Sequence, residues 1–315
     1  MPFRATFQCL WCGAPWSTRG ADDLEGFAQL CPDCVGRAGD NGFLRFRLKT
    51  ALDERARTMA RPGRASAAPA APPAVAASSV PAVAAGELAT EMIAYYEARA
   101  GEYDEWYLRR GRYERGPILD QAWAAELDAA TLWLDGLPWA GEIVELAAGT
   151  GWWSPLLATK GELSIYDAAE APLDRARDRL LAHRLRAHIH VRDAWLEPDR
   201  AVDGLFLGFW LSHVPRAGLV EFLALARRWL KPGGMLTFID SRPDPASGAI
   251  DQPSTPAAES ALGLDRRRLA DGREFRVVQV HYDPAELQAA LLAAGFASAE
   301  VTVTPRFFLL GQARA

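Results

Sequence analysis

The sequence predicts an α/β protein whose main domain is a doubly wound, mostly parallel sheet, preceded by a small, separate N-terminal module. Three observations support this prediction. Short apolar runs alternate with helical segments from residue 142 onward, a glycine-containing turn joins the first run to a helix, and all four cysteines lie in the first 34 residues. Alternation of strands and helices is typical of a parallel sheet covered by helices on both faces.

The elements of the main domain follow from the spacing of its apolar residues. Strands are predicted at 142–146, 162–166, 188–192, 202–210 and 235–240. Helices are predicted at 87–110, 122–137, 152–160, 171–185, 217–230 and 283–295. Two final apolar runs, 298–303 and 307–312, can pair as an antiparallel hairpin.

Composition and charge narrow the range of functions. Half of the 315 residues are hydrophobic, which permits a sizeable core. Residues 1–64 hold ten basic and seven acidic residues, a net +3, and the remainder holds 25 basic and 33 acidic residues, a net −8. An acidic main domain is a poor partner for a phosphate backbone, so nucleic acid is not the expected partner. No run of eighteen apolar residues occurs, so no membrane span is expected.

The four cysteines form two pairs, Cys9 with Cys12 and Cys31 with Cys34, in the pattern C-x2-C-x18-C-x2-C. This spacing is typical of a structural zinc site with four thiolate ligands and no open position. Disulfides would fit a secreted protein, but the N-terminus has no apolar signal segment, so a reducing, cytoplasmic setting is expected. A redox C-x-x-C needs only one pair, whereas iron in a rubredoxin-like site remains an alternative.

The chain divides into three parts on composition. Residues 1–60 comprise the predicted zinc-ribbon-like module and a following helix, which could dock a protein partner. Residues 61–86 are rich in Ala, Pro and Ser and are predicted to be a disordered linker. Residues 87–315 form the main domain.

The turn after the strand 142–146 is the most informative feature of the main domain. It reads Ala147-Ala148-Gly149-Thr150-Gly151 and leads into a helix. Glycines at such a turn permit positive φ and allow a ligand to approach the backbone. Asp167 ends the next strand, where an acidic side chain can accept hydrogen bonds from both hydroxyls of a ribose. The alternative is a tight turn and a helix cap without a ligand.

A dinucleotide site would require a third glycine, as in G-x-G-x-x-G. Here Gly151 is followed by Trp152, Trp153 and Ser154. Two tryptophans would crowd a pyrophosphate, but they can pack against a cofactor that lacks one. The sequence therefore disfavours an NAD dehydrogenase.

The run VELAAGTGWWSPLLA resembles the first motif of class I S-adenosylmethionine-dependent methyltransferases. The family pattern acid-x-Gly-x-Gly-x-Gly reads here Glu145-x-Ala147-x-Gly149-x-Gly151, with alanine at the first glycine. The run LKPGGMLTFIDS and the C-terminal helix with its hairpin are similar to the last part of the family's seven-stranded, Rossmann-like sheet. The resemblance covers about residues 90–315 and implies S-adenosylmethionine as the cofactor.

The resemblance implies roles for individual residues. Glu145 is expected to orient the loop and the methionine ammonium, Gly149 and Gly151 to line the cofactor, and Asp167 to hold the ribose. The other expected cofactor contacts are Asp193 and Ala194 at the adenine, Phe209 and Trp210 at the methionine portion, and Tyr95, Arg99 and Tyr103 on a lid-like helix. Core packing or surface exposure is the alternative for the three lid residues.

The methyl acceptor is less constrained than the cofactor. A base-amine motif of the Asn/Asp-Pro-Pro-aromatic type is replaced by Leu207-Gly208-Phe209-Trp210, and the main domain has no cysteine for cytosine C5 methylation. We therefore expect transfer to an O or N atom of a small molecule. Two alternatives remain, namely a ribosomal-RNA methyltransferase that docks RNA through the zinc module, and a non-catalytic scaffold that binds a partner there.

His213, just after the fourth strand, is the candidate general base, because an imidazole can take a proton from a hydroxyl or amine. A structural histidine is the alternative. The segment 242–282 is an insertion expected to cover the acceptor pocket. Its arginines Arg266–Arg268 and Arg273 could bind an acidic substrate or face solvent.

Overall fold

The structure, a computed structural model, describes residues 6–8, 15–17 and 82–315. Contacts divide the chain into two units, Met1–Ala74 and Val75–Ala315. The predicted ligands Cys9, Cys12, Cys31 and Cys34 lie outside the described residues, as do most of the predicted module and residues 61–81 of the predicted linker.

Two short strands are described in the N-terminal unit. β1 (Thr6–Gln8) and β2 (Pro15–Ser17) pair in antiparallel register, with Gln8 opposite Pro15. The segment between them carries the first cysteine pair and is not described. The strands therefore bring the two ends of that segment together.

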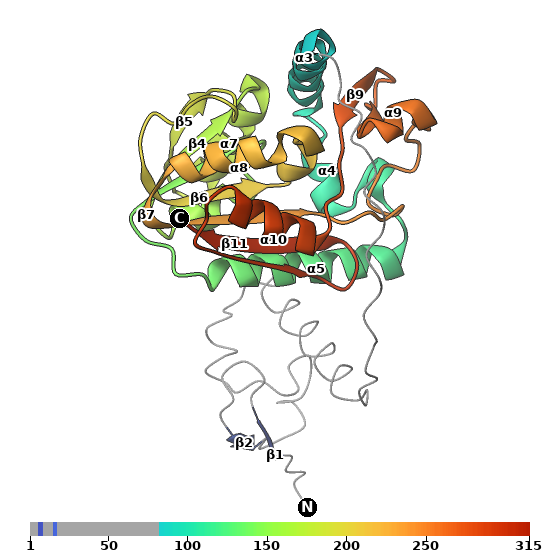
Figure 1. Cartoon of the computed structure of the whole chain (residues 1–315). Coiled ribbons are helices and arrows are strands. Elements are labelled where there is room, and N and C mark those ends of the chain that lie inside the picture. The colour runs from blue at the N-terminus through green and yellow to red at the C-terminus, as the bar shows by residue number, and fades with distance from the viewer. Residues whose placement is uncertain (1–5, 9–14, 18–81) are drawn as a thin grey trace, which may run out of the picture. The chain divides into compact units, whose positions relative to one another are not determined.

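A single seven-stranded sheet forms the larger unit, in the order β10-β11-β7-β6-β3-β4-β5 (Figure 1). Its strands are β3 (Glu142–Leu146), β4 (Glu162–Asp167), β5 (His188–Val191), β6 (Val202–Gly208), β7 (Leu230–Ser241), β10 (Ser298–Val303) and β11 (Phe308–Arg314). Strands β3 to β7 are parallel, whereas β11 is antiparallel to β7 and pairs with β10 as a hairpin. The predicted mostly parallel seven-stranded sheet is confirmed.

Helices cover both faces of this sheet. One face carries α5 (Pro117–Asp135), α6 (Ser154–Ala158) and α7 (Glu170–Ala182), and the other carries α8 (Leu219–Arg228) and α10 (Pro284–Ala293). Neighbouring residues of β3 show the two-sided burial. Ile143 packs in the cluster of Trp123 from α5, and Val144 packs in the cluster of Phe222 from α8. Burial on both faces explains why the central strands read as continuous apolar runs.

The predicted helix 87–110 is two helices, α3 (Ala82–Arg99) and α4 (Tyr103–Leu108). The break includes Gly101, a weak helix former. Residues 82–86, predicted as the end of the linker, belong instead to the start of α3. Their sequence AVAAG is rich in alanine, which has the highest helix propensity.

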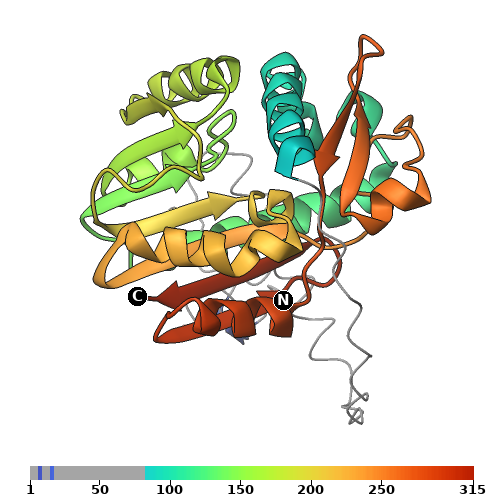
Figure 2. The ribbon, with the colours of Figure 1, turned by 45° about the horizontal axis from the view of Figure 1, so that its top comes forward.

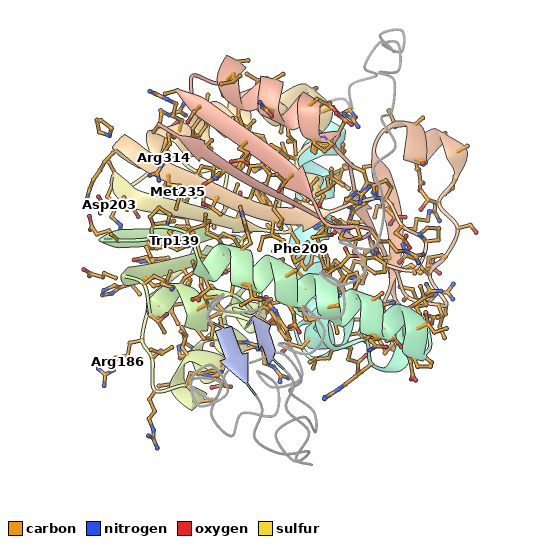
Figure 3. All side chains as sticks on the ribbon, turned by 90° about the horizontal axis from the view of Figure 1, so that it is seen from below. Trp139, Arg186, Asp203, Phe209, Met235 and Arg314 are labelled. Atoms are coloured by element: carbon orange, nitrogen blue, oxygen red, sulfur yellow. The ribbon has the colours of Figure 1, made fainter. Side chains whose placement is uncertain are left out.

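The insertion 242–282 contains the short helix α9 (Ala257–Ala261) and a hairpin of β8 (Leu264–Arg268) and β9 (Glu274–Val278). Figure 2 shows α3 beside this hairpin, above the sheet edge where the parallel strands end, and α3 contacts β9 along its length. Figure 3 places Phe209, which follows β6, well away from Asp203 near the start of the same strand. Within the described part of the chain, no helix is long and apolar enough to cross a membrane.

Candidate active site

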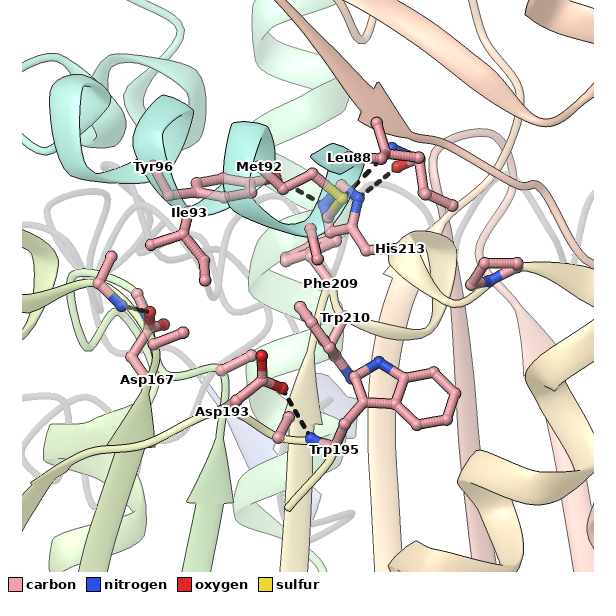
Figure 4. A pocket seen from close by; sticks show the side chains of 18 of the residues that line it. Leu88, Met92, Ile93, Tyr96, Asp167, Asp193, Trp195, Phe209, Trp210 and His213 are labelled. Atoms are coloured by element: carbon pink, nitrogen blue, oxygen red, sulfur yellow. Dashed lines mark hydrogen bonds between the residues drawn. The ribbon is translucent and has the colours of Figure 1, made fainter. Parts of the chain in front are cut away.

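A cavity of about 260 Å³ lies at the carboxyl ends of the parallel strands (Figure 4). Four successive turns, after β3, β4, β5 and β6, form its floor. Figure 4 shows Asp167 and Asp193 at the floor of the cavity, with Met92, Ile93 and Tyr96 of α3 on the opposite side. Ligands of doubly wound sheets bind at this edge, where strand order reverses around the first strand.

The turn after β3 has an unusual backbone. Ala147, Gly149 and Gly151 all have positive φ, of 51°, 55° and 69°. The Gly149 N–H donates to Asp167 Oδ2 at 2.8 Å, which ties the turn to the end of β4. Ala147 and Gly149 line the cavity, whereas Gly151 lies outside its lining and approaches α7, where an added Cβ would stand 2.7 Å from the Cβ of Ala176.

Asp167 is held by two backbone groups. Oδ2 accepts from Gly149 and Oδ1 accepts from the N–H of Ala169 at 2.9 Å. Removal from water raises the pKa of Asp167 to about 6, and these two hydrogen bonds partly offset the effect. A carboxylate has about four acceptor positions, so each oxygen keeps one for a ligand in the cavity.

Asp193 and Ala194, from the turn after β5, also line the cavity. Asp193 Oδ1 accepts from the N–H of Trp195 at 2.8 Å, which fixes the side chain. Asp193 Oδ2 has no hydrogen-bond partner within the described residues of the turn. Ala194 is only 4% exposed and contributes a small apolar surface. A fixed carboxylate beside apolar surface suits the amine and ring of a purine.

Glu145 lies inside the sheet rather than in the cavity lining. It is 1% exposed, and the Ser154 hydroxyl donates to its Oε2 at 2.5 Å. Burial raises the pKa of Glu145 to about 8. Glu145 therefore contacts the start of α6, which follows the glycine turn, and reaches a ligand only through that turn.

A second cavity of about 310 Å³ adjoins the first. It is lined by α3, α4, the segment after β7 and the β8–β9 hairpin. Both cavities share a wall made of Tyr96, Tyr103, Phe209 and His213. Tyr95 and Arg99, predicted as cofactor contacts, line the second cavity only.

His213 and Tyr96 form a hydrogen-bonded pair in this shared wall. His213 Nδ1 lies 2.6 Å from the carbonyl oxygen of Val278, which can only accept, so Nδ1 carries the proton. Nε2 therefore accepts from the Tyr96 hydroxyl at 2.6 Å. Removal from water lowers the pKa of His213 to about 4, so the imidazole is neutral at pH 7.

Phe209 and Trp210 end the turn after β6 and both line the first cavity. Phe209 adopts φ of 57°, uncommon for an aromatic residue, while its N–H donates to the carbonyl of Ile239 at 2.7 Å. The Trp106 ring packs edge-on against it, with centroids 4.8 Å apart. A strained backbone held by packing on several sides is typical of a functional turn.

Comparisons with known proteins agree with this geometry. A methyltransferase-domain family model matches residues 143–234. The structure of DhpI bound to S-adenosylhomocysteine (SAH) is 30% identical, with a TM-score of 0.56, over 72% of this chain and 96% of DhpI. The complex of DhpI with SAM (S-adenosylmethionine) and HEP is also 30% identical, with a TM-score of 0.57, over 72% of this chain and 98% of that one. No curated protein matches the sequence significantly.

The chain belongs to the class I S-adenosylmethionine-dependent methyltransferases. The residues present in this methyltransferase fit that cofactor. Asp167 and Asp193 offer carboxylate oxygens to hydroxyl and amine donors, and the rest of the floor is small or apolar. Tyr103 closes the cavity over the turn, with its hydroxyl 3.1 Å from where a Cβ on Gly149 would lie.

The insertion of the methyltransferase does not supply the free cations that its sequence suggests. Arg266 pairs with Glu259, Arg268 with Glu274 and Arg273 with Asp271. Arg267 alone of the four lines the second cavity, and its guanidinium lies 3.1 Å from Asp265.

Sequence reasoning missed Tyr96, and it did not predict the hairpin of the insertion. The only signal for Tyr96 is its place four residues after Met92 on α3, which puts both side chains on one helix face. Among the described residues of the methyltransferase, no cluster of His, Cys, Asp or Glu could hold a metal ion. This finding does not cover the four predicted cysteine ligands, which lie outside the described residues.

Proposed function

We propose that this methyltransferase transfers a methyl group to an O or N atom of a small molecule bound in the second cavity. The observation that carries the proposal is the shared wall of Tyr96, Tyr103, Phe209 and His213, because a methyl group must cross between the two cavities. The net charge of −8 on the domain also favours a small acceptor over RNA.

The residues of the first cavity would hold S-adenosylmethionine, with Asp167 at the ribose and Asp193 at the adenine amine. When bound, the cofactor supplies an electrophilic methyl group on a positively charged sulfur. Phe209 and Tyr103 exclude water from the shared wall and orient the acceptor, and positioning is the main requirement of such transfers.

The Tyr96–His213 pair would accept the proton that the acceptor loses. When the acceptor atom takes the methyl group from the sulfonium, which leaves as SAH, the acceptor's proton would pass to the Tyr96 oxygen and the Tyr96 proton to His213 Nε2. The imidazole then carries the charge, held by the Val278 carbonyl at Nδ1. The low pKa of His213 keeps Nε2 free of a proton before the reaction.

A metabolite extract incubated with methyl-labelled cofactor tests this function. We expect label in small molecules, at a rate that depends on Tyr96 and His213. Methyl label in ribosomal RNA, together with RNA binding that survives physiological salt, would favour the RNA alternative. Cofactor binding without label in any fraction would favour the scaffold.

For the N-terminal unit we propose a structural zinc ion bound by Cys9, Cys12, Cys31 and Cys34. The pairing of Gln8 with Pro15 supports this, because it brings together the ends of the segment with the first two cysteines. Elemental analysis should find about one zinc per chain, and Cys31→Ser should release it while the main domain still unfolds cooperatively. Iron, or no metal, in fresh protein would contradict the proposal.

A further inference from the structure

Arg99, the last residue of α3, is a buried cation that has no counter-ion among the described residues. Its residue is 8% exposed, and its side chain lines the second cavity. The guanidinium carbon lies 4.5 Å from the ring centre of Tyr103 and 5.6 Å from that of Tyr95. Its one hydrogen bond within the described residues is a long one, 3.4 Å from Nη2 to the Tyr113 hydroxyl, and Nε has no partner there.

The other buried arginine of the described residues, Arg109, is paired, and so is the half-buried Arg267. The Nε of Arg109, which is 6% exposed, lies 3.2 Å from an oxygen of Asp120, and Arg267 lies 3.1 Å from Asp265. A guanidinium does not lose its proton in proteins, so Arg99 keeps its charge away from water. Aromatic faces stabilise such a charge only in part, and a buried charge is costly unless a partner completes its hydrogen bonds.

The rest of the second cavity also offers an unused donor. The Ser247 hydroxyl lines it and is buried without a hydrogen-bond partner among the described residues. Its two carboxylates are occupied, since Asp244 pairs with Arg306 and Asp265 with Arg267. The cavity therefore has a surplus of positive charge and a free hydroxyl donor, which fits a ligand group that only accepts.

We propose that Arg99 binds an oxyanion, a carboxylate or phosphoryl group, carried by the methyl acceptor. This substrate class rests on the proposed function of the second cavity. A planar guanidinium can bind such a group through two parallel hydrogen bonds. Arg99 packs on Tyr103, which lines both cavities, so an acceptor anchored there holds its reacting atom near the shared wall.

The test titrates the full-length, SAH-saturated enzyme with sodium phosphate or sodium acetate at constant ionic strength in chloride. Tryptophan fluorescence, to which Trp106 in the wall of the second cavity contributes, reports binding. We expect saturable binding, weakened about tenfold or more in Arg99→Met, because charged hydrogen bonds are lost. The stronger of the two anions identifies the acceptor group as phosphoryl or carboxylate.

Two further variants sharpen the test. Arg273→Met removes an exposed cation that lines neither cavity and should bind the anion as the wild type does. Arg99→Lys keeps the charge without the planar fork and should bind the anion at an intermediate strength. If Arg99→Met does not fold, this variant tests whether the anion binds through Arg99. No saturable binding by the wild type, or equal binding by all variants, would overturn the proposal.

SAH calorimetry on each variant separates this inference from the proposed function. Normal SAH affinity with lost anion binding assigns the anion to the second cavity. If the anion binds through Arg99 but no acceptor is ever methylated, the proposed function fails and the anion site stands.

Discussion

The two cavities of this methyltransferase share a wall but are built in different ways. The first is floored by turns that follow four neighbouring strands, so the sheet itself fixes the positions of Asp167 and Asp193. The second is lined by side chains of α3, α4 and the insertion 242–282, which are additions to the sheet. Cofactor binding therefore depends on the sheet itself, whereas under the proposed function the choice of acceptor depends on the helices and the insertion added to the sheet.

The largest expected effect is at the wall between the cavities. Tyr96→Phe and His213→Ala should each lower kcat by about 10² to 10⁴, the usual range for loss of general base catalysis. SAH affinity should stay nearly unchanged, because the expected contacts of Asp167 and Asp193 with the ribose and the adenine remain. Single-turnover rates and calorimetry check the two expectations.

Tyr282→Phe is the matched control. It removes a buried hydroxyl that donates to the Val214 carbonyl and lines neither cavity, so it should leave kcat near the wild-type value. In the wild type, kcat should stay constant from alkaline pH down to about pH 5. It should fall below that pH as His213 is protonated near its pKa of about 4. Unchanged kcat in both wall variants would show that transfer needs no base there.

The next effect is confined to the first cavity. Asp167→Ala should weaken SAH binding by about a hundredfold, since two charge-assisted hydrogen bonds to a ribose contribute about 2–3 kcal/mol. Asp174→Ala, which removes an exposed carboxylate from α7, should have no effect on SAH binding. Anion binding in the second cavity should survive in both variants, and its loss in Asp167→Ala would mean that the two cavities are not independent.

A further effect concerns the pH dependence of stability rather than catalysis or binding. The pKa of Glu145 is raised from 4.5 to about 8 by burial, so the folded protein holds this proton more tightly than the unfolded chain does. The stability that this provides is complete below pH 4.5 and is lost as the pH rises to 8, at about 1.4 kcal/mol per pH unit. Urea unfolding of Glu145→Gln should lack this part of the slope. An identical pH dependence of stability in the wild type and the variant would show that the Glu145 proton does not contribute to folding stability.

The smallest effect is at the alanine that replaces the family's first glycine. Ala147 has φ of 51°, a strained value for a residue with a Cβ. Ala147→Gly should therefore stabilise the protein by about 0.5–1 kcal/mol. Ala148→Gly, next to it and without a positive φ, should destabilise by a similar amount. The urea midpoints of the two variants measure these changes in stability. A destabilised Ala147→Gly variant would show that the surrounding turn already compensates for the strain at Ala147.

The part of the site that sequence could predict is the part that the sheet determines. Asp167 and Asp193 each follow a short apolar run, and parallel strands deliver their carboxyl ends to one edge. Tyr96 was beyond reach because four tyrosines crowd the sequence of α3 and α4, and only packing against β9 selects which one meets His213. Arg99 was predicted as a cofactor contact, and its place at the second cavity instead depends on packing against Tyr95, Tyr103 and Tyr113, which its sequence position does not show.

The insertion shows the same limit. Its run of arginines suggested free cations, yet pairing with Glu259, Glu274 and Asp271 depends on the β8–β9 hairpin and its neighbours. The spacing of residues in the sequence does not indicate which acidic side chains pair with these arginines. The helix at residues 82–86 was missed for another reason, because alanine favours helices even in a segment whose composition resembles a linker.

A crystal structure of the enzyme with SAH would show directly which cavity holds the cofactor. We expect the ribose hydroxyls at Asp167, the adenine at Asp193 and Ala194, and the sulfur at the wall formed by Tyr96, Tyr103, Phe209 and His213, with the second cavity left for the acceptor. SAH bound with its sulfur directed away from that wall, or lying in the second cavity beside Arg99, would contradict this expectation.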